Sequence, residues 1–420
     1  MIVAIILIAT AVYYTIGQNC QSLILVVVSL YVYWELASWN VLLIGVLGVC
    51  VALCSMLLYN MHNRYLVALP TLLLLCGFFI FKNQYSGLAL PLGYSVVAFT
   101  SISLLVDQYK FPSQYSFLDS LSFLLFFPKM FAGPIERANH FIDNDKKSFG
   151  VNNIYSGIKY LIFAAFCKLI IGDYLTAVDI QGEGINLWLQ VLCYSLNFFF
   201  DFWAYSLMAI GFGKLFGYNL AISFYKPYYS ASFREFWHRW NITLGSWLRD
   251  YIYIPLGGNR NKSLKWIAVV LLVFLVSGVW HGTTLPFLLW GLIHAFLLII
   301  EHRAINGKLN RLTRFFNSVG IFVIVSLLWQ LFIIKDMEVI PVMLSNLFIS
   351  SSLQWSYMAK FLIGGMAMII LTSDYIFSLV ETTSHTNKSI IAEVSMLSLM
   401  LVALLIFNCP MNFNFFYFRF

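Results

Sequence analysis

Charged residues are scarce in this sequence. Only 10% of its 420 residues are Asp, Glu, Lys or Arg, whereas 61% are hydrophobic. A soluble domain carries about 25% charged residues, so the composition excludes that class and indicates a membrane protein with several spans. The net charge of +7 does not indicate nucleic-acid binding, because the basic residues cluster in short loops between apolar runs. We therefore expect membrane lipids, and no nucleic acid, as partners.

The sequence also lacks the short motifs of several enzyme classes. It contains no G-x-S-x-G, no H-E-x-x-H, no P-loop and no dinucleotide-binding fingerprint. Its seven cysteines show no metal-ligand spacing, so we expect small buried hydrophobic residues and no metal site. They are Cys20, Cys50, Cys54, Cys76, Cys167, Cys193 and Cys409.

Long apolar runs, by contrast, fill most of the chain. A span of the bilayer takes about 20 residues, so we predict an all-α integral membrane protein of about eleven transmembrane helices, with two re-entrant or half-length pieces. No fixed-period repeat or long linker divides the chain, which predicts a single domain over residues 1–420. The first run lacks a basic start and a small-residue cleavage site, so we expect a first span there. The runs cover residues 1–17, 23–38, 41–59, 66–83, 88–106, 118–132, 154–172, 187–212, 266–281, 284–300, 317–334, 339–350, 358–378 and 391–408.

Lys and Arg predict the orientation. The loop with Lys129, Arg137, Lys146 and Lys147 is expected on the cytoplasmic side, as are residues 214–265 and the loop after Arg303. Residues 173–186 contain three acidic residues and no Lys or Arg, so we expect them outside. Counting spans from these loops places both termini outside, provided that residues 118–132 and 339–350 do not cross.

The cytoplasmic region 214–265 is rich in aromatic residues and arginine. From Phe233 to Leu248 its pattern favours short amphipathic helices in the membrane interface. Arg234, Arg239 and Arg249 could bind the phosphates of a cytoplasmic donor such as a coenzyme A thioester. The alternative is that these arginines set the topology and contact anionic lipids.

His281 is the histidine that ends a continuous apolar run, Trp266 to Val276 followed by Ser277 to Gly282. A neutral imidazole there could act as general base on a hydroxyl, because its pKa can lie near the operating pH. The alternative is a structural histidine between helices. The flanking glycines, Gly278 and Gly282, would let a substrate or another backbone approach closely.

Three further polar residues are weaker candidates. Asn241 follows Trp240 in an expected polar-aromatic helix, where its amide could hold a carbonyl oxygen or orient the base, or serve only as a helix cap. His238 could be a second catalytic group or an interfacial packing residue. His294 could form a hydrogen bond across helices.

Residues 127–137, with Pro128, Gly133 and Pro134, interrupt helix formation. Broken backbone at membrane depth must line a cavity or be buried in protein. We therefore expect this segment to form a wall of a reaction chamber.

Six ordered motifs resemble those of the membrane-bound O-acyltransferases, and most closely their bacterial alginate O-acetyltransferase branch. The resemblance implies a ring of tilted helices around a chamber that the donor enters from the cytoplasm, with His281 as the essential histidine. The motifs are Leu105–Tyr109, Ala132–Ile135, Asp201–Ser206, Phe236–Leu244, Trp247–Arg260 and Ser277–Gly282.

The chain departs from that branch at one position. Asn241 stands in a W-N-I-T-L sequence where the alginate-type proteins usually have histidine in W-H-I-S-L, and is closer to the asparagine of the eukaryotic members. A second catalytic histidine at that position is thereby excluded, and His281 remains as the sole base.

The tail, residues 410–420, carries a second resemblance. Its ending, Phe415-Phe416-Tyr417-Phe418-Arg419-Phe420, is similar to an aromatic motif in the partner peptide of the teichoic-acid D-alanylation system and in some polysaccharide acyltransferases. That resemblance implies Tyr417 as an acyl carrier. The alternative is an interfacial aromatic anchor.

Together these features predict a membrane-bound O-acyltransferase of the bacterial cytoplasmic membrane. Acetyl-CoA is the expected donor substrate, with no permanently bound cofactor, and a cell-envelope polysaccharide is the final acceptor. An extracytoplasmic SGNH-type acyltransferase is the expected partner. Alternatives are transfer of D-alanine or a longer acyl chain, and, from another class, a secondary transporter or a non-catalytic scaffold of an export complex.

Overall fold

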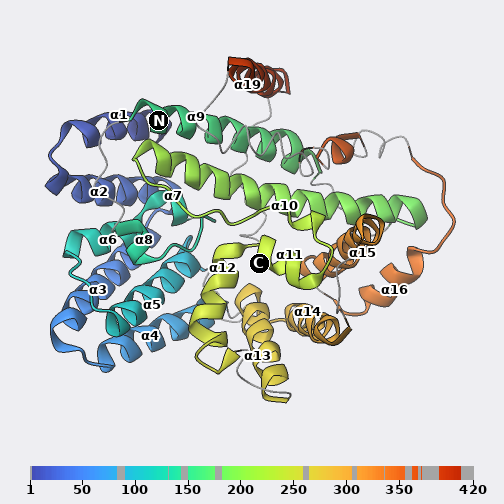
Figure 1. The fold of residues 1–420 in the computed structure, drawn as a ribbon, viewed down its shortest axis with the longest axis horizontal. Coiled ribbons are helices and arrows are strands. Elements are labelled where there is room, and N and C mark those ends of the chain that lie inside the picture. Colours follow the sequence, from blue (N-terminus) through green and yellow to red (C-terminus); the bar gives the residue numbers. More distant parts are fainter. Residues whose placement is uncertain are drawn as a thin grey trace. The chain divides into compact units, whose positions relative to one another are not determined.

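The computed structural model contains helices and no strands in the part of the chain that it describes (Figure 1). This part comprises residues 2–82, 90–130, 132–142, 150–175, 182–258, 264–304, 310–334, 336–354, 362–367, 370 and 387–407. Its contacts divide the chain into two compact units. Unit 1 is Met1–Leu161 with Tyr205–Ile222, and unit 2 is Ile162–Ala204 with Ser223–Phe420. The single domain of the sequence analysis stays a prediction.

Unit 1 holds the first eight helices, most of α9 and the end of α10. Within it, α3 packs against α5 and α6, and α2 packs against α6. The helices are α1 (Ile2–Thr15), α2 (Gln18–Ala37), α3 (Asn40–Met61), α4 (Tyr65–Lys82), α5 (Tyr94–Lys110), α6 (Phe117–Leu125), α7 (Phe127–Met130), α8 (Ala138–Ile142), α9 (Val151–Phe166) and α10 (Gly184–Leu215).

Unit 2 begins at Ile162, within the last turns of α9, and contains most of α10. Its most extensively packed pair of helices is α13 and α14. The elements that follow α9 are η1 (Cys167–Gly172), η2 (Asp173–Leu175), η3 (Pro227–Tyr229), α11 (Phe233–Arg239), α12 (Ile242–Leu248), η4 (Arg249–Tyr253), α13 (Leu264–His281), α14 (Leu285–Ala304), α15 (Arg311–Trp329), η6 (Gln330–Phe332), α16 (Val339–Asn346) and α19 (Asn387–Phe407).

Seven of the described helices are long and apolar enough to cross a membrane, which confirms the predicted class of all-helical multi-span protein. The expected total of about eleven stays a prediction, because only the described residues can be compared. The seven are Cys20–Ala37, Asn40–Met61, Tyr65–Lys82, Val151–Leu175, Leu264–His281, Leu285–His302 and Arg311–Phe332.

Two runs that were expected to be short are short. Residues 118–132 contain α6, of nine residues, and α7, of four. Residues 339–350 contain α16, of eight. Since a span needs about 20 helical residues, neither run forms a full-length transmembrane helix.

Side-chain caps explain where several helices begin. The hydroxyl of Ser116 accepts a hydrogen bond from the backbone N–H of Asp119 at 3.0 Å, which starts α6. Ser232 caps α11 in the same way, through Glu235 at 3.0 Å. Asn310 caps α15, through Thr313 at 2.8 Å. These caps bond N–H groups that would otherwise lack a partner at each helix start.

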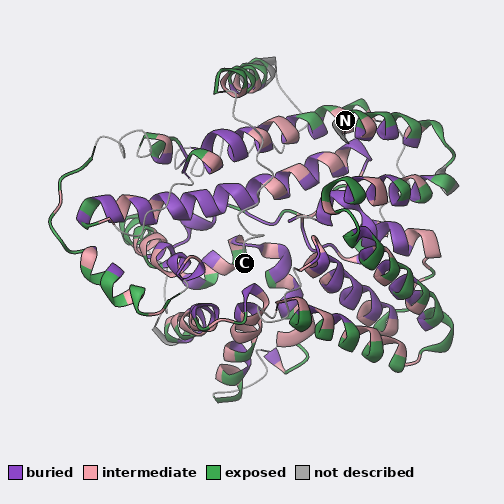
Figure 2. Ribbon diagram, turned by 180° about the vertical axis from the view of Figure 1, so that it is seen from behind, coloured by how far each residue is buried: buried purple, intermediate pink, exposed green. Residues whose placement is uncertain are grey.

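Several helices have exposed faces (Figure 2), and many of the exposed residues are large and apolar. On α3, for example, Leu42, Val46 and Leu53 are all exposed, and their spacing puts them on one face. This surface suits lipid, and it explains one wrong prediction. Cys20, Cys50 and Cys76 are exposed, and Cys54 is half-buried, because residues of an apolar run can face lipid as well as protein. The expectation of burial is correct for Cys167 and Cys193, while Cys409 lies outside the described residues.

The interrupted segment after α6 is buried in unit 1. Lys129 has no exposed surface, and its ammonium lies 3.6 Å from the ring centroid of Phe123. A Cβ added at Gly133 would lie 2.3 Å from Cα of Lys129, so only glycine fits there. Glu136 follows, and its carboxylate accepts from the backbone N–H of Ala221 and contacts His140 at 2.9 Å. The broken backbone is thus enclosed by protein, which is one of the two expected outcomes for this segment.

Candidate functional site

His281 is the last residue of α13 and lies within an aromatic cage. Its ring is 4.5 Å from that of Trp280 and 4.9 Å from those of Trp290 and Phe332, measured between centroids. Only 7% of the residue is exposed. These contacts hold the imidazole in place while part of it stays accessible.

Glycines let α14 approach α13 closely beneath this cage. A Cβ at Gly278 would lie 2.5 Å from the carbonyl oxygen of Phe287, and one at Gly291 would lie 2.4 Å from that of Phe274. No side chain larger than hydrogen fits between the two backbones at these points. The expectation that Gly278 permits close backbone approach is confirmed.

Asn241 lies at the break between α11 and α12, not inside a helix as the sequence predicted. Its φ of 42° and ψ of 54° are in the left-handed region, which asparagine adopts more readily than most residues. The next N–H, of Ile242, donates to the carbonyl of Ser223 at 2.8 Å and fixes the turn. The Asn241 side chain does not cap α12, so its amide is available for other contacts.

Trp240 anchors this turn from the adjacent position. It is 3% exposed, and its ring packs 4.8 Å from that of Trp329 and 5.6 Å from that of Phe236, between centroids. Aromatic packing of this kind adds about 0.5–1.5 kcal/mol per pair beyond area burial. The strained turn is therefore supported by the core of unit 2.

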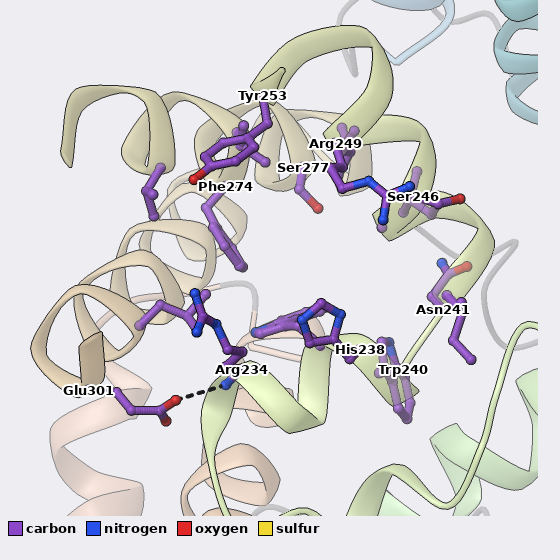
Figure 3. Close-up of a pocket in the computed structure, with 18 of the residues that line it drawn as sticks. Arg234, His238, Trp240, Asn241, Ser246, Arg249, Tyr253, Phe274, Ser277 and Glu301 are labelled. Carbon is purple, nitrogen blue, oxygen red and sulfur yellow. Dashed lines mark hydrogen bonds between the residues drawn. The ribbon is translucent and has the colours of Figure 1, made fainter. Parts of the chain in front are cut away.

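A cavity of about 740 Å³ joins these residues (Figure 3). Both Asn241 and His281 line it, so the structure brings the two principal candidates to one site. One face of α13 forms a long wall. That face carries Trp266, Val270, Val273, Phe274, Ser277 and His281.

Two of the three predicted donor-binding arginines line the cavity. Arg234 comes from α11 and Arg249 from the start of η4. Arg249 also pairs with Asp250, with 2.9 Å between Nε and Oδ1. Arg239 is not among the lining residues; its guanidinium binds Glu235 at 2.6 Å.

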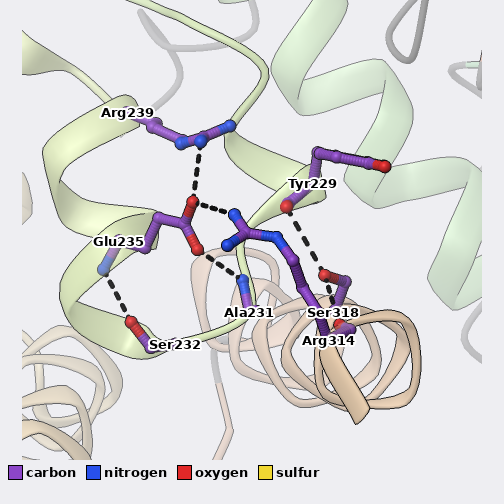
Figure 4. Close-up of polar contacts among 7 residues, drawn as sticks. All are labelled: Tyr229, Ala231, Ser232, Glu235, Arg239, Arg314 and Ser318. Atoms are coloured by element: carbon purple, nitrogen blue, oxygen red, sulfur yellow. Dashed lines mark hydrogen bonds and ion pairs between the residues drawn. The ribbon is translucent and has the colours of Figure 1, made fainter. Parts of the chain in front are cut away.

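Carboxylates hold α11 in position. Glu301 on α14 accepts hydrogen bonds from the backbone N–H groups of Phe233 and Arg234, the latter at 3.1 Å (Figure 3). Glu235 binds both Arg239 and, at 2.5 Å, Arg314 on α15 (Figure 4). The helix that leads to Asn241 is thereby tied to two others.

Three other histidines of unit 2 differ in whether they line the cavity. His238 and His302 line the cavity, whereas His294 does not. His294 is wholly buried, and its ring lies 5.0 Å from those of Trp237 and Trp290, between centroids. Neither of its nitrogens has a hydrogen-bond partner in the described chain, so the expected bond across helices is not formed there.

Two other expected parts of the site are not found at this cavity. Residues 127–137 do not line this cavity, so the chamber wall expected of them is not found here. Tyr417 lies outside the described residues.

The sequence analysis missed Ser277, Tyr253 and Glu301 as lining residues. No group of three or more His, Cys, Asp or Glu in the described ranges could hold a metal ion.

The comparisons decide the family. The model of MBOAT, the membrane-bound O-acyltransferase family, matches residues 1–335. The chain belongs to this family. It is 30% identical to a probable alginate O-acetylase of Pseudomonas aeruginosa over 401 residues, which cover 87% of this chain and 76% of the relative.

Two other relatives of this O-acyltransferase have different names. A peptidoglycan O-acetyltransferase of Helicobacter pylori is 32% identical over 302 residues, 62% of this chain and 57% of that protein. A teichoic acid D-alanyltransferase of Bacillus subtilis is 30% identical over 228 residues, 49% and 58% of the two chains. The predicted enzyme class and the resemblance are confirmed, which favours an enzyme over a transporter or scaffold.

Proposed function

We propose that this enzyme moves an acetyl group from cytoplasmic acetyl-CoA across the bacterial cytoplasmic membrane for O-acetylation of an envelope polysaccharide. The observation that carries the proposal is that Asn241 and His281 share one cavity with Arg234 and Arg249. A base, a polarising amide and cations for phosphates are the groups that a charged thioester donor requires.

The chemistry assigned to His281 is general-base catalysis. The imidazole takes the proton of the accepting hydroxyl as its oxygen attacks the thioester carbonyl. The carbon–sulfur bond then breaks, and the leaving thiolate receives the proton from the imidazolium. Asn241 orients the hydroxyl or polarises the carbonyl through its amide.

The cavity suits an extended donor. From Trp266 to His281 the lining face of α13 rises 1.5 Å per residue, which gives a length of about 22 Å. The middle of this face is apolar, and the cavity lining also includes two arginines. Such a lining fits a donor that has an uncharged arm ending in phosphates. Residues 214–265 are proposed to face the cytoplasm, where such a donor is made.

The names of the relatives support an envelope polymer as acceptor. Alginate O-acetylase and peptidoglycan O-acetyltransferase relatives favour acetyl transfer to a polysaccharide. The teichoic acid D-alanyltransferase relative keeps D-alanyl transfer as the second candidate. We also propose an extracytoplasmic SGNH-type partner that completes the transfer, and Tyr417 as the acyl carrier on the outer side.

Donor competition tests the proposal. Membranes carrying the full chain and the extracytoplasmic partner would receive either radiolabelled acetyl-CoA or a D-alanyl carrier-protein thioester, with the envelope polysaccharide of the source cells. We expect label from acetyl-CoA on the polysaccharide, and its loss in His281→Ala. Transfer from the D-alanyl thioester alone would support the second candidate, and transfer that does not depend on His281 would refute both.

A further inference from the structure

Ser277 is a buried polar residue whose hydroxyl faces the cavity. It lies on α13 and is 6% exposed. Figure 3 shows its oxygen pointing into the space that the lining residues enclose. Among the described residues, no hydrogen bond of this hydroxyl is found.

A helical serine usually has a local partner available. Its hydroxyl can donate to a carbonyl three or four residues earlier, as Ser246 does to Thr243 at 2.9 Å on the neighbouring α12. Ser326 on α15 also lacks a partner, but it is fully enclosed and does not line the cavity. Ser277 therefore combines an available donor with access to a ligand.

The position of Ser277 relative to His281 suggests which ligand atom it meets. The two residues are four apart on one helix, so they share a face and lie about 6 Å apart along the axis. A carbonyl carbon attacked by a hydroxyl that His281 activates must lie near the imidazole. Its oxygen is then within reach of a donor one turn away.

We propose that Ser277 is a further catalytic residue, whose hydroxyl donates a hydrogen bond to the carbonyl oxygen of the donor thioester. The proposal rests on the function proposed above and assigns a role that neither Asn241 nor His281 fills. When the acceptor oxygen attacks, the carbonyl π electrons move onto that oxygen, and Ser277 stabilises the negative charge. The electron pair on that oxygen re-forms the carbonyl bond as the carbon–sulfur bond breaks and the thiolate leaves. Ser277 keeps its proton throughout and is unchanged at the end.

The helix around Ser277 is built to hold such a donor rigidly. The next residue, Gly278, packs directly against the backbone of Phe287 on α14. Close backbone packing prevents α13 from shifting at this level. Preorganised donors aimed at a developing oxyanion give the largest catalytic effect, because they need not reorient during the reaction.

The kinetics of Ser277→Ala test this role. With purified full-length protein, the extracytoplasmic partner, radiolabelled acetyl-CoA and the envelope polysaccharide, we expect kcat to fall by about 10²-fold, as for loss of one oxyanion donor, while KM changes less than about twofold. Ser277→Thr keeps a hydroxyl and should recover most of the lost kcat. Ser326→Ala is the matched control and should behave as wild type.

Several outcomes would overturn the inference. One is a normal kcat in Ser277→Ala, and another is a raised KM with unchanged kcat, which would indicate ground-state binding only. An acetyl group found on Ser277 by mass spectrometry would make it a nucleophile instead. His281→Ala is measured in parallel: an active His281→Ala protein refutes the proposed function, whereas an inactive one beside a normal Ser277→Ala refutes only the role of Ser277.

Discussion

Asn241 combines a left-handed backbone conformation with a side-chain amide at the cavity. Asn241→Ala should lower activity by about 10²–10³-fold through loss of the amide. It should also lower stability by about 1–2 kcal/mol, because alanine tolerates this φ poorly. Asn241→Gly removes the amide but accepts the backbone, so it should be inactive yet as stable as wild type. Kinetics and thermal unfolding of the purified variants measure both effects.

Substitution by histidine provides the contrasting experiment. If Asn241→His were as active as wild type, the amide would not be specifically required. A stable and fully active Asn241→Gly would show that this position serves only the turn.

Single residues show where sequence reasoning reaches its limit. His281 and Asn241 were identifiable from motifs, but Glu301 was not, because its partners on α11 lie 67 and 68 positions away. The ion pair of Arg239 with Glu235, by contrast, could be predicted from the local sequence. Glu235 precedes it by four residues, the spacing of a helical ion pair.

At the scale of elements, the segment after α12 presents Arg249 to the cavity. Charge reversal in Arg249→Glu should raise KM for acetyl-CoA more than it lowers kcat, since a phosphate contact acts on substrate and transition state equally. Arg311→Glu reverses a charge on the start of α15, outside the cavity lining, and is the matched control. Equal kinetics in the two variants would mean that Arg249 serves topology alone.

The short helix α7 should make stability depend on pH. Burial lowers the pKa of Lys129 from 10.5 to about 7, while Glu136 acts in the opposite direction. Between these values the folded protein binds fewer protons than the unfolded chain. The free energy of unfolding should therefore rise with pH across this window, by up to about 1.4 kcal/mol per pH unit. Below pH 7 the folded protein should bear the full cost of burying a charged Lys129.

Lys129→Met removes the titrating group and should flatten that dependence. Thermal midpoints in detergent between pH 7 and 10 would measure it, with Lys110→Met, at an exposed position, as the control. The same pH slope in Lys129→Met and wild type would contradict the assignment.

Element boundaries were largely predictable because they have local causes. Apolar runs, prolines and caps such as Ser232 act within a few residues. Packing partners were not predictable: the contact of α13 with α14 depends on Gly278 and Gly291, and nothing in either segment alone specifies the other. The interrupted segment around Pro128 was recognised as special and its burial was one of two expected outcomes, but the residues that enclose it were not predicted.

On the scale of the whole molecule, the composition determined the class and the apolar runs determined most spans. The π-helical segment η1 was not foreseen, since it depends on tertiary contacts. There Lys168 binds Asp173 at 2.5 Å and Asp201, on α10, at 2.7 Å. Such buried charges require paired partners, which a sequence read one segment at a time does not reveal.

The proposed carrier role of Tyr417 concerns the complete chain. A phenol has a pKa of about 10, so a base can assist its attack on a thioester, and the aryl ester can pass the acyl group onward. Tyr417→Phe keeps the ring and removes the nucleophile, and should bind donor without acylating the polymer. Intact mass of the C-terminal peptide should show an acyl adduct in wild type only. A fully active Tyr417→Phe protein would leave the tail as an anchor.

Sidedness tests the central claim most directly, because the account has a cytoplasmic donor, a cavity with His281 and an acceptor outside. Sealed right-side-out vesicles carrying the full chain and the extracytoplasmic partner would be loaded with radiolabelled acetyl-CoA and supplied externally with the polysaccharide. We predict external labelled polymer with donor inside, none with donor outside, and none with His281→Ala in either arrangement. Labelling from external donor, or labelling that persists in His281→Ala, would contradict the account.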